Sequence, residues 1–321
     1  MIRLTFCFFL VVTPALAGVT EVYKSLLGDK DFNVIYPVVV ERAGHPLPMK
    51  LRVTWPSGDG PFPLVVFSQG ALCPKNMYAN ITDHWTSHGY VTIAPLHLDS
   101  QSVGLTMKEL GSEGLLMQRI VDLSHVLDVL DEIVSLIPQL PLKSIDQENI
   151  AVAGHSFGGQ VALALVGLTL VDLKTSQELD ASDPRFDAAV VLSGVGPMSN
   201  IGKSAFDKLR LPVYSSGGTN DLGATGRGPV HPWQWRMSAY YKSPVGDKFG
   251  VILNEGDHYY GGLICRQTVG GKPDYEGLSI IRGTSLAFLD AYLKADKVAQ
   301  NFLSDIDLVT VTNGRSELKR K

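Results

Sequence analysis

A serine flanked by glycines lies where an apolar segment gives way to a helical one. Residues 149–167 read N-I-A-V-A-G-H-S-F-G-G-Q-V-A-L-A-L-V-G, so a G-x-S-x-G pentapeptide is centred on Ser156. The apolar residues 150–153 predict a buried strand, and the residues after Gly159 predict a helix. A serine in such a strand-to-helix turn sits at a strained backbone angle with its hydroxyl exposed. This context predicts a nucleophile; the alternative is a glycine-rich turn that merely contains a serine.

An acid and a base follow two later apolar segments. Asp221 comes directly after the segment around 211–215, and His258 comes directly after segment 249–253. A serine hydroxyl is a poor nucleophile at neutral pH until a base accepts its proton, and histidine, with an ordinary pKa of ~6.5, can do so. A carboxylate beside the imidazole holds its tautomer and stabilises the imidazolium. We therefore expect a triad of Ser156, Asp221 and His258.

Other readings of these positions stay open. Asp257 is a rival acid, but a carboxylate rarely points at the ring of the adjacent residue in the chain. Asp99, after the apolar segment 90–94, is a second rival with a poorer chain order. Asp221 and His258 could also be ordinary turn residues, since aspartate and histidine both occur in turns.

The negative charge that develops during acyl transfer needs two N–H donors. One is the backbone N–H of Phe157, the residue after the nucleophile. The other is expected from the loop after the apolar segment 64–67, and we assign it to the backbone N–H of Ala71. Cys73 and Cys265 lie in loops at this same edge, so a disulfide between them would tie the oxyanion loop to the loop after His258. Two free buried thiols are the alternative.

The elements that must position these residues alternate between strands and helices. Strands that are apolar throughout suit a parallel sheet covered on both faces. The sequence therefore predicts one doubly wound, mostly parallel α/β domain over 18–321, with a core of about 31–295 and a tail, 296–321, that adds little. The expected strands are 31–41, 49–55, 62–68, 90–94, 150–153, 186–192, 211–215 and 249–253, and the expected helices are 75–88, 112–137, the segment after Gly159, 234–241 and 278–294.

Composition narrows the function classes. The chain has 321 residues, of which 45% are hydrophobic and 19% charged, with a formal net charge of −4. This is ordinary globular composition, and without a basic patch it gives no support for nucleic-acid binding. No cysteine and histidine spacing resembles a zinc site, and the expected chemistry needs no metal and no cofactor. The oligomeric state is left open by the sequence.

The first residues have the pattern of a secretory signal peptide. Arg3 precedes the apolar run 4–12, and Ala15-Leu16-Ala17 fits a small-x-small cleavage site. The apolar run is too short to cross a bilayer core of ~30 Å. We expect cleavage after Ala17, a secreted or periplasmic mature protein without a membrane span, and therefore a compartment in which a disulfide is stable.

Several aromatic side chains and histidines are candidates for the substrate pocket. The loop 223–248 and the residues after His258 are rich in aromatic rings, which can clamp an acyl or aromatic group; ordinary core packing is the alternative. The candidates are His97, His155, His231, Trp233, Trp235 and Tyr259, with Tyr240, Tyr241 and Tyr260 nearby.

Three segments carry a resemblance to a known superfamily. V-V-F-S-Q-G-A-L resembles an F-S-H-G oxyanion segment, with Gln69 where histidine is common. H-W-T-S-H-G-Y-V-T-I-A-P is similar to L-A-S-H-G-Y-V-V-V-A-P, and S-I-D-Q-E-N-I-A-V-A-G-H-S-F-G-G is similar to R-I-D-x-x-x-I-A-V-x-G-H-S-F-G-G. From about Phe62 to Asp221, and sparsely to His258, the chain resembles the secreted branch of the α/β-hydrolases around dienelactone hydrolase, chlorophyllase, platelet-activating-factor acetylhydrolase and bacterial cutinase.

The resemblance implies the α/β-hydrolase fold and the order Ser156, Asp221, His258, with the amides of Phe157 and Ala71 as oxyanion donors. It does not imply one substrate, and a serine nucleophile disfavours the chemistry of the cysteine-dependent dienelactone hydrolases. We expect a secreted serine hydrolase that cleaves a small or polymeric carboxylic ester through an acyl-enzyme. The alternatives are an amidase or peptidase on the same triad, and a catalytically idle hydrolase fold that serves as a binding module.

Overall fold

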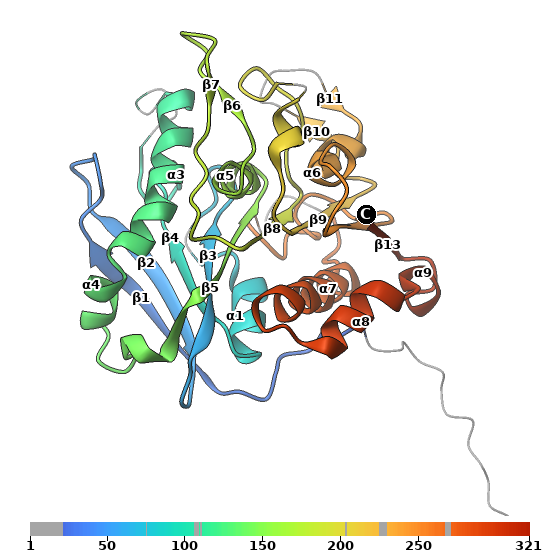
Figure 1. Ribbon diagram of the computed structural model, residues 1–321, viewed down its shortest axis with the longest axis horizontal. Helices are drawn as coiled ribbons and strands as arrows, with labels where there is room; N and C mark the ends of the chain where they lie inside the picture. The colour runs from blue at the N-terminus through green and yellow to red at the C-terminus, as the bar shows by residue number, and fades with distance from the viewer. Residues whose placement is uncertain are drawn as a thin grey trace, which may run out of the picture.

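The computed structural model describes residues 22–74, 76–105, 109, 111–202, 204–224, 230–266 and 271–321. A nine-stranded sheet in the order β1-β2-β4-β3-β5-β8-β9-β12-β13 crosses the molecule (Figure 1). Neighbouring strands from β4 to β12 are parallel, and β1, β2 and β13 are antiparallel to their neighbours. The strands are β1 (Phe32–Val40), β2 (Met49–Pro56), β3 (Phe62–Ser68), β4 (Val91–Pro95), β5 (Ile145–His155), β8 (Ala188–Leu192), β9 (Val213–Gly218), β12 (Lys248–Leu253) and β13 (Ser316–Arg320).

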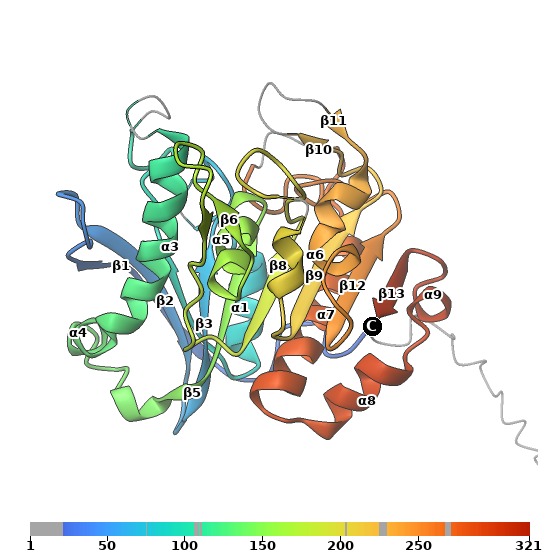
Figure 2. The same ribbon diagram turned by 45° about the horizontal axis from the view of Figure 1, so that its top comes forward.

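Helices cover both faces of this sheet, as the apolar strands require (Figures 1 and 2). Helices α3, α4 and α5 pack on one face, and α1, α7 and α8 pack on the other. The helices are α1 (Ala79–Ser87), α3 (Ser112–Asp128), α4 (Leu130–Ser135), α5 (Phe157–Leu165), α6 (Ser238–Tyr241), α7 (Tyr275–Leu293), α8 (Lys297–Asp305) and α9 (Leu308–Val311), with 3-10 helices η1 (Leu142–Ser144), η2 (Ala205–Lys208) and η3 (Trp233–Met237).

Strand β3 illustrates why these sequences are apolar at every position. Its Leu64 and Val66 belong to the core beneath α3 and α5, whereas Val65 and Phe67 belong to the core beneath α1 and α7. Successive side chains of a strand point to opposite faces, so a strand buried on both faces cannot alternate with polar residues. The doubly wound mostly parallel α/β fold predicted from the sequence is confirmed.

Three elements differ from the predicted ones. The predicted helix 112–137 is interrupted at Val129 (φ −110°, ψ 21°), which separates α3 from α4. Strand β5 begins at Ile145, before the apolar run, because Ile145 and Asp146 already pair with Phe62 and Pro63 at the start of β3. The predicted helix 234–241 is η3 followed directly by α6.

The segment after 296 contributes more than the sequence suggested. It forms α8, α9 and β13, and β13 pairs antiparallel with β12 along its whole length. Leu303 and Leu318 are buried against α7 and the sheet. The sequence signal was present in Asp296 and Asp307, whose side chains accept hydrogen bonds from backbone N–H groups at the starts of α8 and α9.

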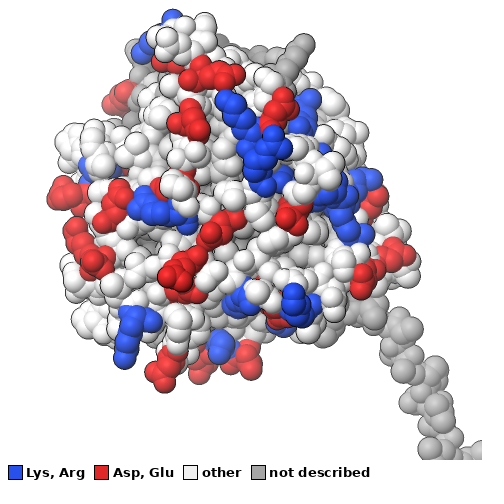
Figure 3. All heavy atoms as spheres, viewed as in Figure 1, with Lys and Arg blue, Asp and Glu red and all other residues white. Residues whose placement is uncertain are grey.

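Two small two-stranded sheets accompany the main one. They are β6 (Leu170–Val171) with β7 (Glu178–Leu179), and β10 (Gly223–Ala224) with β11 (Val230–His231). Strands β10 and β11 lie beyond the end at which the parallel strands finish, and β6 and β7 run beside α5 (Figure 2). Basic and acidic side chains are interspersed over the face in Figure 3, so this face presents no broad field of one sign. Within the described ranges, no helix has the length and hydropathy that a bilayer crossing requires. The predicted signal peptide, 1–17, lies outside the described residues.

Candidate active site

Ser156 occupies the turn between β5 and α5 in a conformation rare for a residue with a side chain. Its backbone has φ 54° and ψ −116°, and its N–H donates to the carbonyl of Leu192, 2.9 Å away, at the end of β8. The flanking glycines permit this turn. A Cβ on Gly154 would lie 2.2 Å from the Gly158 carbonyl oxygen, and one on Gly158 would lie 2.0 Å from that of Ser68. Only glycine allows strand and helix to approach this closely, and a strained serine is typical of functional turns.

Asp221 and His258 lie together at the same edge. His258 Nδ1 is 2.8 Å from Asp221 Oδ1, and the same oxygen is 3.2 Å from Arg236 Nε. The hydroxyl of Ser193, the residue after β8, donates to Asp221 Oδ2. Burial alone would raise the pKa of Asp221, but His258, Arg236 and the Ser193 hydroxyl hold it below its ordinary value. Asp221 is therefore an ionised acceptor, which places the proton of a neutral His258 on Nδ1 and leaves Nε2 able to accept one.

The two rival carboxylates are engaged elsewhere. Asp257 accepts hydrogen bonds from the backbone N–H groups of Tyr259 (2.7 Å) and Gly261 (3.0 Å), so it holds the turn that carries His258. Asp99 is fully buried and forms a two-pronged ion pair with Arg119. Neither carboxylate is paired with the His258 ring in the described structure.

A chain of buried hydrogen bonds connects the loop after β3 to His258. The N–H of Gly70 donates to Tyr78 Oη (2.9 Å), Tyr78 Oη lies 2.8 Å from His155 Nδ1, and His155 Nε2 lies 2.9 Å from the His258 carbonyl oxygen. Burial first, and then the proximity of His258, hold the pKa of His155 well below its ordinary value. A neutral ring facing a carbonyl must donate from Nε2, so its Nδ1 accepts the Tyr78 proton.

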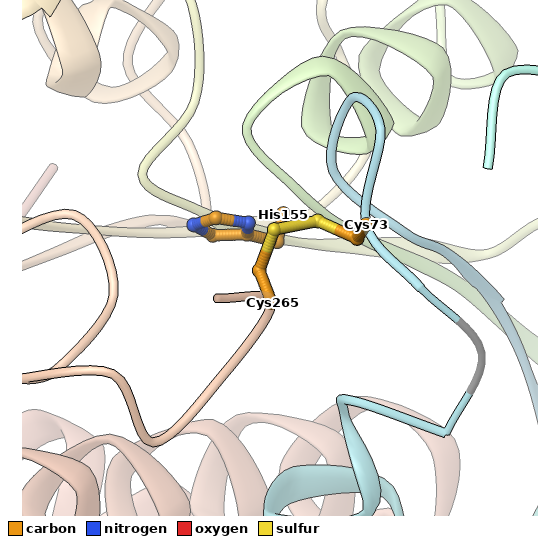
Figure 4. Close-up of side chains that lie close together, drawn as sticks. All are labelled: Cys73, His155 and Cys265. Carbon is orange, nitrogen blue, oxygen red and sulfur yellow. A yellow bond between two sulfur atoms is a disulfide. The ribbon is translucent and has the colours of Figure 1, made fainter. Parts of the chain in front are cut away.

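A disulfide covers this chain. Cys73, in the loop after β3, is bonded to Cys265, in the loop after His258, with a Cα–Cα distance of 4.9 Å. Figure 4 shows the bond beside the ring of His155, whose nitrogen lies within 4.8 Å of both sulfur atoms. Two thiolates and an imidazole would suit a metal ion, but sulfurs bonded to each other are not thiolate ligands. In this oxidised state the three side chains are a structural cluster.

Two pocket candidates are wrong, because they do not reach solvent. His97 is fully buried between Ser68 Oγ (2.9 Å) and an Asp122 carboxylate oxygen (2.9 Å). His155 is fully buried with both ring nitrogens occupied, as described above. The His155 ring therefore supports the site from within through the His258 carbonyl, and the His97 ring belongs to the core between Ser68 and Asp122; neither ring lines the site.

The aromatic candidates divide into packing and rim residues. The Trp235 ring is buried, stacks on His231 (5.0 Å between centroids, 4° between planes) and donates to the Pro197 carbonyl. The half-exposed Tyr259 ring lies edge-on to His258, with 4.8 Å between centroids. His231 and Trp233 are likewise half-exposed, whereas residues 225–229 of the same loop lie outside the described residues.

The proposed oxyanion donors lie on the two segments that the sequence indicated. Ala71 is half-buried in the turn after β3, and Phe157 is the first residue of α5, where backbone N–H groups have no partner within the helix. A cavity of about 550 Å³ also exists, but it is lined by Phe62 and Asp146 at the opposite end of β3 and β5. It is therefore separate from the edge that carries Ser156.

Four supporting residues were missed by reasoning from sequence. Ser193 and Arg236 contact Asp221, Tyr78 contacts His155, and Arg119 is buried against the loop after β3. Ser193 had one signal, a polar residue directly after an apolar strand. The other three make contacts across the fold that no local pattern encodes.

The comparisons with known proteins agree with this architecture. The sequence model of the family described as "Chlorophyllase" matches residues 19–203, which include Ser156 but end before Asp221 and His258. Chlorophyllase-2 of Arabidopsis thaliana is 29% identical over 205 residues, covering 60% of this chain and 56% of the relative. Chlorophyllase-1, chloroplastic, of Citrus sinensis is 29% identical over 126 residues, covering 37% of this chain and 33% of the relative.

The chain thus aligns with about half of the first relative's length and a third of the second's. The family match extends over more than half of this chain. Together with the nine-stranded sheet, this match shows that the chain belongs to the chlorophyllase family, within the α/β-hydrolase superfamily.

Proposed function

We propose that the protein hydrolyses carboxylic esters through an acyl-enzyme formed on Ser156. The observation that carries this proposal is that a strained serine after β5 and the hydrogen-bonded pair of Asp221 and His258 follow parallel strands at the same edge of the sheet. The residue before the serine donates to the His258 carbonyl, and the residue after β8 donates to Asp221. These contacts tie the three elements to one another at one edge of the sheet.

In the first half-reaction, His258 Nε2 accepts the proton of Ser156 as Oγ attacks the ester carbonyl carbon. The Oγ–C bond forms while the carbonyl π electrons move to oxygen, giving a tetrahedral oxyanion. Asp221 stabilises the imidazolium through Nδ1–H. Collapse of the oxyanion expels the alcohol, which takes the proton from His258. Water then attacks the acyl-enzyme by the same steps, releasing the acid and free Ser156.

The N–H groups of Ala71 and Phe157 are the proposed donors to the oxyanion. Both belong to the backbone, so the geometry of their segments matters more than their side chains. The N-terminus of α5 adds the positive end of its dipole to the same place.

The half-exposed rings near His258 are the proposed contacts for the substrate. Tyr259, Trp233 and His231 offer apolar faces with polar edges, which suit an uncharged acyl or aromatic ester. Chlorophyll, the ester named in the relatives' descriptions, is a further substrate to test beside the nitrophenyl esters.

We further propose that the protein is secreted or periplasmic and begins after Ala17. The support is the pattern of the first 17 residues together with the disulfide, a bond that persists in oxidising compartments. N-terminal sequencing of the protein from its native source tests this; a mature chain that still starts at Met1 contradicts it.

The central experiment combines labelling with turnover. A fluorophosphonate probe should label Ser156 in the folded protein, and Ser156→Ala should remove both labelling and hydrolysis of a nitrophenyl ester panel while leaving the unfolding midpoint nearly unchanged. Turnover in the purified Ser156→Ala protein refutes the proposal. Faster cleavage of matched nitroanilides than of esters favours an amidase, and absence of labelling and turnover in the wild type favours a binding module.

A further inference from the structure

We propose that Arg119 is a positioning residue that orients the oxyanion loop, residues 69–72, and so sets the direction of the Ala71 N–H. This inference rests on the proposed ester hydrolysis and deepens it. Arg119 lies on α3, remote in sequence from every segment of the proposed site. Its side chain is nonetheless fully buried, and it donates to the carbonyl oxygens of Gln69 and, at 3.2 Å, Gly70.

The guanidinium is itself held by a buried carboxylate. Arg119 Nε lies 2.9 Å from Asp99 Oδ1, and Nη2 lies 2.7 Å from both carboxylate oxygens. Asp99 Oδ2 also accepts the N–H of Leu72, at 3.1 Å. The planar guanidinium fixes several donors in one fork. Arg119 and Asp99 together therefore bind both peptide groups that flank Ala71, through the Gly70 carbonyl on one side and the Leu72 N–H on the other.

Peptide geometry converts these contacts into a direction for Ala71. In a trans peptide the C=O of one residue and the N–H of the next point in opposite directions. Arg119 holds the Gln69 carbonyl, and on the other side of that peptide the Gly70 N–H donates to Tyr78. By the same rule, holding the Gly70 carbonyl turns the Ala71 N–H away from Arg119.

The three consecutive N–H groups of the loop are therefore used differently. The N–H of Gly70 donates to Tyr78 Oη, and that of Leu72 donates to Asp99. The N–H of Ala71 has no acceptor among the residues that the structure describes. The Ala71 N–H, which is free to bind an oxyanion, is thus the donor proposed from the sequence.

Arg119 also reaches the other proposed donor. The centre of its guanidinium lies 4.6 Å from the centroid of the Phe157 ring, a cation–π contact with the first residue of α5. One buried side chain thus contacts both segments whose backbone N–H groups would bind the oxyanion. A residue that only anchored α3 would need neither the carbonyls of the loop nor this ring.

The same helix offers a matched control. Asp122, one turn after Arg119, is paired with the buried Arg42, and Arg42 also donates to the Leu96 carbonyl. Each pair joins one residue of α3 to a residue of another segment. The contacts of Arg42 and Asp122 include His97 but involve neither residues 69–72 nor Phe157. Changing both members of a pair avoids leaving one buried charge without its partner.

The test compares Arg119→Met/Asp99→Asn with Arg42→Met/Asp122→Asn. The first double variant is expected to lose about 10- to 100-fold in kcat on a nitrophenyl ester with KM little changed, because a misdirected donor acts on the transition state alone. Its affinity for a boronic acid, which mimics the tetrahedral oxyanion, should fall in parallel. The control should keep both values within about twofold of the wild type, although its unfolding midpoint falls similarly.

Each other outcome overturns a defined claim. If the Arg119→Met/Asp99→Asn protein keeps the wild-type kcat, or if the control loses as much, the positioning role is wrong while ester hydrolysis stands. If the wild type neither turns over esters nor labels with a fluorophosphonate, both proposals fall. Should the double variant not fold, Asp99→Asn alone, which keeps the side-chain volume, takes its place. Its kcat and its boronic acid affinity are then compared with those of the wild type in the same way.

Discussion

Tyr78→Phe should destabilise the protein far more than the loss of one hydroxyl usually does. Tyr78 Oη accepts the Gly70 N–H and faces His155 Nδ1, and all three groups are buried. The substitution leaves a buried donor and a buried acceptor without partners. Each such group costs about 1–3 kcal/mol, so we expect the free energy of unfolding to fall by about 2–4 kcal/mol.

Tyr214→Phe is the matched control. Tyr214 is also fully buried, and its hydroxyl lies 2.7 Å from Thr284 Oγ1. Thr284 donates its own proton to the Ile280 carbonyl at 2.7 Å, so the tyrosine must donate to the threonine. Its loss leaves only a spare acceptor position, and we expect a decrease of about 1 kcal/mol.

Urea unfolding of both variants, followed by circular dichroism, gives the two free energies at equal m-values. The kcat for a nitrophenyl ester should fall further in Tyr78→Phe than in the control, because the lost hydroxyl joins the oxyanion loop to the residue that holds the His258 carbonyl. If Tyr78→Phe is no more destabilising than Tyr214→Phe, the hydrogen-bond chain through His155 does not support the site as described.

Three further predictions concern the acid, the disulfide and pH. Asp221→Asn should lower kcat by about 10⁴, and Asp257→Asn should change it little; the reverse result in ester turnover would identify Asp257 as the acid. Thiol titration of denatured, unreduced protein that lacks residues 1–17 should find neither Cys73 nor Cys265 free, and two reactive thiols would contradict the disulfide. Burial and, after it, Arg119 lower the pKa of His97 to about 4, so below its ordinary pKa the unfolded chain binds a proton that the folded protein does not. The free energy of unfolding should therefore decrease as the pH is lowered from ~6.5 to about 4. Between pH 7 and 5 the wild type should lose about 2 kcal/mol more than His97→Gln in urea unfolding, and equal losses would show that His97 titrates normally.

The sequence predicted the parts of the fold that local patterns encode. Strand β3 is apolar at every position because both faces of the sheet are covered, and that pattern is legible without coordinates. The glycines around Ser156 are legible for the same reason, since a close approach of strand to helix leaves room for nothing larger. The family match confirms the superfamily that these segments indicated.

Supporting contacts between distant segments could not be predicted in this way. Arg119 looks like any charged residue on an amphipathic helix until α3 packs across the loop after β3. His155 looked like a pocket residue because it adjoins the nucleophile, but β5 directs its ring inward toward Tyr78. In both cases, tertiary packing decides whether a polar side chain is buried, and a single sequence does not encode that packing locally.

The pairing of β12 with β13 has a consequence for biogenesis. Strand β12, with the sequence K-F-G-V-I-L, leaves the ribosome well before β13, so its outer edge is unpaired in the nascent chain. An open apolar edge invites pairing with other polypeptides, and a chaperone or rapid release would be needed to protect it. Strand β13, S-E-L-K-R, then closes that edge with charged side chains that discourage further strand addition. A chain truncated before residue 316, which lacks β13, should therefore form inclusion bodies although it still contains every residue of the proposed site.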